Sequence, residues 1–119
     1  MSVLVAVVDS KEGQHALTAA VQEAQQLGTD LVVVNLALNA FDPSVLPDDL
    51  QHEVVNRSGA GDADQVDVVL DALERRPDAT RLVIGLRRRS PIGKAVLGSI
   101  SQRLLLESPV PVLAVKIAS

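Results

Sequence analysis

Four cationic side chains gather in one short stretch of the chain, between residues 85 and 101. They are Arg87, Arg88, Arg89 and Lys94, and no Asp or Glu occurs anywhere from residue 79 to residue 106. Guanidinium and ammonium groups bind phosphate oxygens, and arginine does so with paired hydrogen bonds. The charge of this stretch therefore favours an anionic ligand, and phosphate is the obvious candidate.

A predicted helix start follows these cations. Gly98 lets the backbone come close to a ligand or a neighbouring segment. Ser99 stands three residues before Gln102, which is the spacing of a capping box. Because the free N–H groups at a helix start bind anions, we expect Ser99, Ile100 and Ser101 to contact the ligand together with the arginines.

The basic stretch also has a second interpretation. Residues 42–78 hold ten acidic residues against three arginines, so the cations could form ion pairs with that segment, within one chain or across a dimer. They could also be a solvated surface loop. Arg88 itself has two possible roles, since its side chain could hold a phosphate or fill the space that a phosphate needs.

Three positions of this stretch match a known nucleotide-binding loop. The loop of the universal stress protein family reads Gly, two residues, Gly, nine residues, Gly, and then Ser or Thr. Gly85, Gly98 and Ser99 fall at that spacing, whereas Arg88 replaces the second glycine. The chain thus resembles this family over most of its length. The resemblance implies an α/β fold and a ligand that is ATP or a related nucleotide, with or without Mg²⁺.

The resemblance also implies two other parts of the binding site. Asp9 follows the first strand, where nucleotide-binding family members have an Asp, so its carboxylate would face the adenosine end of the ligand. Backbone groups near Val34 would meet the base. Asp9 also stands three residues before Glu12, so it could instead cap the first helix.

Catalytic chemistry is not supported by any motif. A P-loop around Gly93 would require Gly at position 88 and Ser or Thr at position 95, but the chain has Arg88 and Ala95. His15 and His52 are typical of surface positions, and no general base is evident. We therefore expect a regulatory or stress-response protein in which the nucleotide is a ligand rather than a substrate. The main alternative is an interaction module of the same fold that has lost its nucleotide site, and a slow hydrolase is a third option.

Alternating apolar runs and helical patterns predict how these residues are positioned. They indicate an open, mostly parallel five-stranded sheet with helices on both faces. In such sheets ligands bind at the carboxyl ends of the strands, so Asp9, the loop after Leu38 and the loop after Gly85 should converge. Strands are expected at residues 3–8, 31–38, 53–57, 81–86 and 110–117, helices at 12–27, 64–76 and 99–107, and an irregular segment with at most one helical turn at 39–51, where full-length family members have a helix.

Composition limits the remaining classes of function. The 119 residues, 47% of them hydrophobic, suit a single domain over residues 1–119. One Phe, no Tyr or Trp, and a net charge of −4 argue against nucleic-acid binding. The absence of Cys suits a reducing compartment. Without a signal-peptide pattern or an apolar run of about 20 residues, we expect a cytoplasmic protein with no membrane partner.

The last apolar run suggests a homodimer. It begins at Val110 and ends at Ile117, and at a sheet edge it would expose unpaired backbone groups that a second chain can bind. Family members often dimerise through this strand. We therefore expect Val112, Leu113 and Val115 near a two-fold interface.

Overall fold

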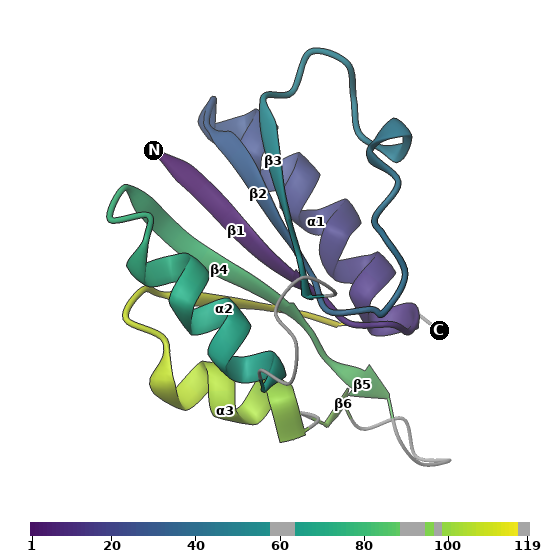
Figure 1. Ribbon diagram of the computed structural model, residues 1–119, viewed down its shortest axis with the longest axis vertical. Coiled ribbons are helices and arrows are strands. Elements are labelled where there is room, and N and C mark those ends of the chain that lie inside the picture. Colours follow the sequence, from purple (N-terminus) through teal and green to yellow (C-terminus); the bar gives the residue numbers. More distant parts are fainter. Residues whose placement is uncertain (58–63, 89–94, 97–98, 117–119) are drawn as a thin grey trace.

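The β-branched and leucine-rich runs form a parallel sheet, because strands buried on both faces need apolar side chains in both directions. The computed structural model describes residues 1–57, 64–88, 95–96 and 99–116. The strand order is β3-β2-β1-β4-β7 and every neighbouring pair is parallel (Figure 1). This confirms the predicted five-stranded α/β fold. The strands are β1 (Ser2–Val7), β2 (Asp30–Asn35), β3 (His52–Asn56), β4 (Ala79–Gly85) and β7 (Val112–Val115).

Helices cover both faces of this sheet. α1 (Lys11–Leu27) lies on one face, and α2 (Gln65–Glu74) and α3 (Ser99–Glu107) lie side by side on the other (Figure 1). Each face has its own apolar layer, one built around Ala16 and Leu17 of α1 and the other around Val69 and Leu104. α1 ends as expected at Gly28, whose φ of 65° is left-handed. No helix of the described segments is long and apolar enough to cross a membrane.

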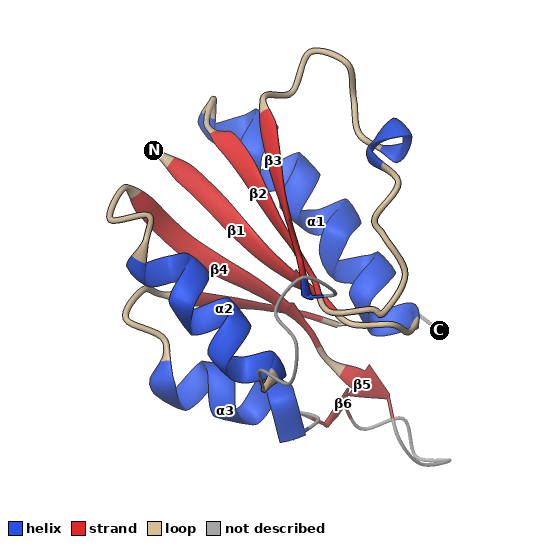
Figure 2. Cartoon of the chain, in the orientation of Figure 1, coloured by secondary structure: helices blue, strands red, loops and turns tan. Residues whose placement is uncertain are grey.

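Residues 36–51 connect β2 to β3 without an α-helix. They contain one 3₁₀ turn, η1 (Pro43–Val45), which agrees with the predicted irregular segment (Figure 2). Leu46 and Leu50 are buried in the same apolar layer as α1. These two side chains therefore anchor the connection to the sheet.

Two of the five strands, β2 and β7, are shorter than predicted. β2 stops at Asn35 instead of Leu38, because the Asn35 side chain accepts a hydrogen bond from the backbone N–H of Ala37 and turns the chain. β7 begins only at Val112, since proline at position 111 has no N–H to donate. A feature that was not predicted is a two-residue antiparallel ladder between β5 (Arg87–Arg88) and β6 (Ala95–Val96).

Candidate functional site

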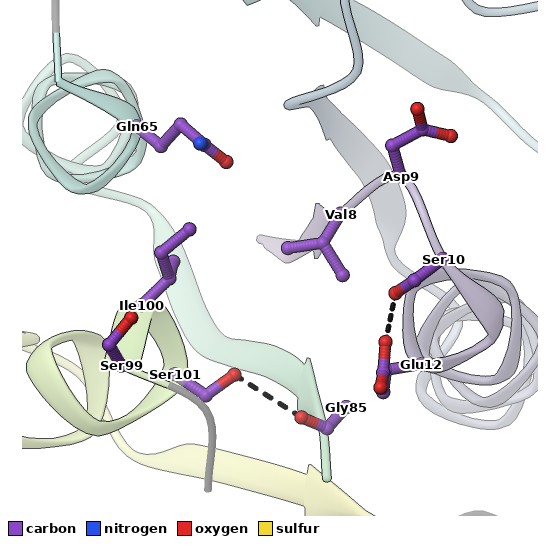
Figure 3. Close-up of a pocket in the computed structure, with 9 residues that line it drawn as sticks. All are labelled: Val8, Asp9, Ser10, Glu12, Gln65, Gly85, Ser99, Ile100 and Ser101. Carbon is purple, nitrogen blue, oxygen red and sulfur yellow. Dashed lines mark hydrogen bonds between the residues drawn. The ribbon is translucent and has the colours of Figure 1, made fainter. Parts of the chain in front are cut away.

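The carboxyl ends of β1 and β4 border an open pocket of about 160 Å³. After β1 the chain adds β2 and β3 on one side of it and then β4 and β7 on the other side. This reversal of strand order is the usual binding position in open parallel sheets. We call this cavity the β1–β4 pocket; its lining residues are Val8, Asp9, Ser10, Glu12, Gln65, Gly85, Ser99, Ile100 and Ser101 (Figure 3).

Three helices begin at this pocket. Ser10 and Glu12 come from the start of α1, Gln65 is the first residue of α2, and Ser99 is the first residue of α3 (Figure 3). The first N–H groups of a helix have no partner within it, and the helix dipole places partial positive charge there. Three such ends supply N–H donors and partial positive charge that a phosphate can meet, beside the carboxylates of Asp9 and Glu12 in the same lining.

An ion pair connects the start of α2 to the middle of α3. Asp64 caps α2 by accepting a hydrogen bond of 2.8 Å from the N–H of Val66, and Arg103 of α3 lies 3.3 Å from the Asp64 carboxylate. The Val66 hydrogen bond and, to a lesser extent, Arg103 lower the pKa of Asp64. Asp64 in turn raises the pKa of Arg103. The lowered pKa of Asp64 and the raised pKa of Arg103 both favour the charged forms, so the ion pair between the start of α2 and the middle of α3 is maintained.

Two glycines allow α1 to lie directly on the ends of the strands. A Cβ at Gly13 would be 2.0 Å from the carbonyl oxygen of Val8, and one at Gly85 would be 2.4 Å from that of Glu12. The carbonyl of Gly85 also accepts a hydrogen bond of 3.2 Å from the hydroxyl of Ser101 (Figure 3). Gly85 thus joins β4 to α1 on one side and to α3 on the other.

The structure corrects two expectations about helix caps. Ser10, not Asp9, occupies the cap position of α1, and its hydroxyl donates a hydrogen bond to the Glu12 carboxylate. The alternative in which Asp9 caps this helix is therefore wrong. α3 begins at Ser99 itself, one residue earlier than a Ser99 cap would require, so the position before the helix falls on Gly98, outside the described residues.

A second pocket of about 220 Å³ also has Asp9 in its lining. It shares Val8 and Asp9 with the β1–β4 pocket. Figure 3 shows the Asp9 carboxylate pointing away from Gly85. We call this cavity the loop pocket, because much of its wall is the segment 37–45; its lining residues are Val7, Val8, Asp9, Gln14, Asn35, Ala37, Asn39, Ala40, Phe41, Asp42 and Val45.

The structure brings together most of the predicted site residues that it describes. Val34 is the exception: it is fully buried within β2, paired with Ala6 and Val55, and lines neither pocket. Arg87 and Arg88 form the backbone of β5, and their side chains lie outside the description, as do Arg89, Lys94 and Gly98. The predicted residues that meet at the β1–β4 pocket are Asp9, Gly85, Ser99, Ile100 and Ser101.

Sequence reasoning missed three residues that build the site. Gln65 stands at the start of a correctly predicted helix, and that position was the only signal for it. Gly13 lies inside a helical pattern, where an isolated glycine often has a packing reason. Asn35 ends a buried strand as its only polar side chain besides Asp30, which marks a strand end that could bind a ligand.

The lining groups of the β1–β4 pocket include both hydrogen-bond donors and acceptors. The hydroxyl of Ser99 and the amide of Gln65 can donate hydrogen bonds to a phosphate, whereas the single hydroxyl hydrogen of Ser101 already goes to the carbonyl of Gly85. Asp9 can accept a hydrogen bond from a hydroxyl or an amino group. Within the described residues, neither pocket is lined by a histidine. Nor do three His, Asp or Glu side chains of the described segments gather as a metal site.

The chain resembles universal stress proteins in sequence and in structure. Residues 49–116 match the model of the universal stress protein family. A universal stress protein of Mycolicibacterium smegmatis is 41% identical over 115 residues, which cover 87% of this chain and 88% of the relative. A universal stress protein of Archaeoglobus fulgidus, solved in complex with dAMP, has a TM-score of 0.65 at 21% identity and 98% coverage of both chains. Another universal stress protein, solved in complex with cAMP, has a TM-score of 0.67 at 21% identity, with 97% of this chain and 95% of that chain covered.

Proposed function

Because the chain belongs to the universal stress protein family, we propose that it binds an adenine nucleotide, ATP or a related one, as a regulatory ligand. The observation that carries this proposal is the meeting of three helix starts around the β1–β4 pocket. Two proteins of the same fold were solved with adenine nucleotides, one with dAMP and one with cAMP. Both ligands carry a single phosphate, the kind of group that helix starts favour.

The nucleotide spans both pockets in this proposal. Pockets for small ligands commonly measure about 300 to 1,000 Å³, and neither the 160 Å³ nor the 220 Å³ cavity reaches that size alone. The phosphate lies in the β1–β4 pocket, near Ser99 and Ser101. The base lies in the loop pocket beside Phe41, the only aromatic residue of the chain, and Asp9 lies between the two ends.

Binding calorimetry and thermal unfolding with AMP, ADP and ATP, each with and without Mg²⁺, test this function. A ligand at one hundred times its Kd stabilises the folded state by about 2.7 kcal/mol. The midpoint temperature of unfolding, Tm, should therefore rise by several degrees. Guanosine monophosphate serves as the control for the base. If no nucleotide at millimolar concentration gave heat or a shift, the alternative function would stand, an interaction module without a nucleotide site.

We also propose that the chain forms a homodimer through β7. This strand is the last in the sheet order, so one of its edges has no neighbouring strand among the residues that the structure describes. Leu113 is 38% exposed, and Val112 and Val115 are half-buried. Pairing with a second copy would cover these side chains and satisfy the free backbone groups of the edge.

Replacing Leu113 with lysine should weaken this dimer, because a charge would be buried in an apolar interface. Sedimentation equilibrium at micromolar protein should give a dimer mass for the wild type and a lower mass for Leu113→Lys. Leu38→Lys is the matched control, since Leu38 is 74% exposed and distant in sequence from β7. A wild-type monomer mass that does not change with concentration would contradict the dimer.

A further inference from the structure

We propose that Asn35 and Asn56 are positioning residues for the base, and that Asn56 acts through its side-chain oxygen alone. They hold the wall of the loop pocket from the ends of β2 and β3. This inference rests on the proposed nucleotide function, because it concerns the same site. The two side chains fix the base end of the site and do not affect the phosphate end.

Asn35 uses both of its amide hydrogens and its side-chain oxygen in hydrogen bonds at the end of β2. Its side chain is 3% exposed. Nδ2 donates to the carbonyl oxygen of Asn39 at 2.7 Å and to Oδ1 of Asn56 at 2.9 Å, and Oδ1 accepts from the N–H of Ala37 at 3.1 Å. The backbone partners, one an acceptor and one a donor, fix which side-chain atom is nitrogen and which is oxygen.

The end of β3 holds the same segment from the other side. Oδ1 of Asn56 also accepts from the N–H of Phe41 at 3.3 Å. Next to it, Arg57 donates to the carbonyl oxygen of Leu36 at 3.3 Å. The backbone of the segment 36–41 is thus hydrogen-bonded to side chains at the ends of β2 and β3, although the segment itself forms neither a helix nor a strand.

These bonds shape the loop pocket directly. Four residues of the tied segment line it, namely Ala37, Asn39, Ala40 and Phe41. A wall that is ordered before the ligand arrives loses less conformational entropy on binding. Loss of the hydrogen bond from the N–H of Phe41 to Asn56 should therefore weaken contacts to the base. The β1–β4 pocket has none of these four residues in its lining, so phosphate contacts should be unaffected.

Two substitutions of Asn56 separate this role from a general structural one. Asn56→Asp keeps an oxygen that can accept from both Asn35 and Phe41, and its added charge lies at an exposed position beside Arg57. Asn56→Ala removes that oxygen. If the oxygen positions the wall, Asn56→Asp should retain the AMP affinity that Asn56→Ala loses.

Calorimetry should measure Kd for AMP and for ribose 5-phosphate with wild type, Asn56→Ala and Asn56→Asp. Losing two neutral hydrogen bonds should weaken AMP binding by about fivefold in Asn56→Ala. Ribose 5-phosphate, which lacks the base, should bind both variants as it binds wild type. Asn56→Asp should match wild type for AMP. Equal AMP binding by all three proteins, equal loss of both ligands in Asn56→Ala, or failure of Asn56→Asp to restore AMP binding would overturn the inference.

Amide hydrogen exchange adds a measurement that needs no ligand. The N–H of Phe41 should exchange faster in Asn56→Ala and at the wild-type rate in Asn56→Asp. If wild type bound no AMP, the proposed function would fail, and the base-positioning role would fail with it. A difference at Phe41 would then still show that Asn56 orders the segment, whereas unchanged exchange in Asn56→Ala would remove that role as well.

Discussion

Replacing Gly13 with alanine should destabilise the protein by about 2 kcal/mol or more, although alanine is the better helix former. The added Cβ would lie 2.0 Å from the carbonyl oxygen of Val8, a distance that real contacts do not reach, so either α1 or the end of β1 must move. The helix preference for alanine over glycine amounts to about 1 kcal/mol, which is smaller than the cost of displacing a packed backbone. Urea unfolding should show the loss directly.

Gln22→Ala is the matched control for this substitution. Gln22 lies at an exposed position of the same helix, so its replacement should change the free energy of unfolding by less than about 0.5 kcal/mol. Unchanged or increased stability of Gly13→Ala would mean that α1 can move off the strand ends. Gly13 would then not be what places Ser10 and Glu12 at the pocket.

Replacing Ser99 with glutamate should have opposite effects on ligand binding and on stability. Ser99 is the first residue of α3, is exposed, and lines the β1–β4 pocket. A carboxylate in the first turn of a helix stabilises it by about 0.3 to 1 kcal/mol. The same carboxylate would repel a phosphate in the pocket by about 2 kcal/mol or more, so AMP should bind at least tenfold more weakly. Calorimetry and thermal unfolding measure the two effects separately.

Gln102→Glu supplies the control for charge. Gln102 lies in the same first turn of α3 and is exposed, but it does not line the pocket. Its replacement should stabilise the helix similarly and leave AMP binding nearly unchanged at physiological salt. Equal loss of affinity in both variants would indicate a general charge effect, and no loss in Ser99→Glu would place the phosphate elsewhere.

The fold was predictable because its signals are local. Continuous apolar runs identified the strands, and the three- and four-residue spacing of apolar side chains identified the helices. α3 was predicted with its observed bounds, and Gly28 marked the end of α1 because a left-handed residue is needed there. The meeting of Asp9 and Gly85 followed from topology, since carboxyl ends of parallel strands share one edge of the sheet.

The details of the site were less predictable because they depend on contacts between elements. The choice between Asp9 and Ser10 as cap of α1 depends on a shift of one residue, and both have suitable side chains. Gly13 is required only because Val8 lies against it. Asn35 and Asn56 are 21 residues apart, and nothing in the local pattern of either strand links them.

Position 88 is where the chain departs from the glycine pattern of the family loop. Arg88 stands where the family has a glycine, and its backbone pairs with Ala95 in the β5–β6 ladder. Two roles proposed for its side chain, phosphate ligand or obstruction, predict opposite effects of Arg88→Gly on AMP binding. Their common requirement is that the phosphate reaches the β1–β4 pocket.

The most direct measurement is an NMR titration of the isotope-labelled wild-type protein with AMP, followed through the backbone amide signals. The proposed site predicts concentration-dependent shifts in two groups of residues at once. One group is at the helix starts, Ser10 to Gly13 and Ser99 to Ser101, and the other is in the segment 37–45 of the loop pocket. The amide signals at the amino ends of the strands, such as those of His52 and Glu53, should not shift. Absence of shifts at millimolar AMP, or shifts confined to the amino ends of the strands, would contradict nucleotide binding at this site.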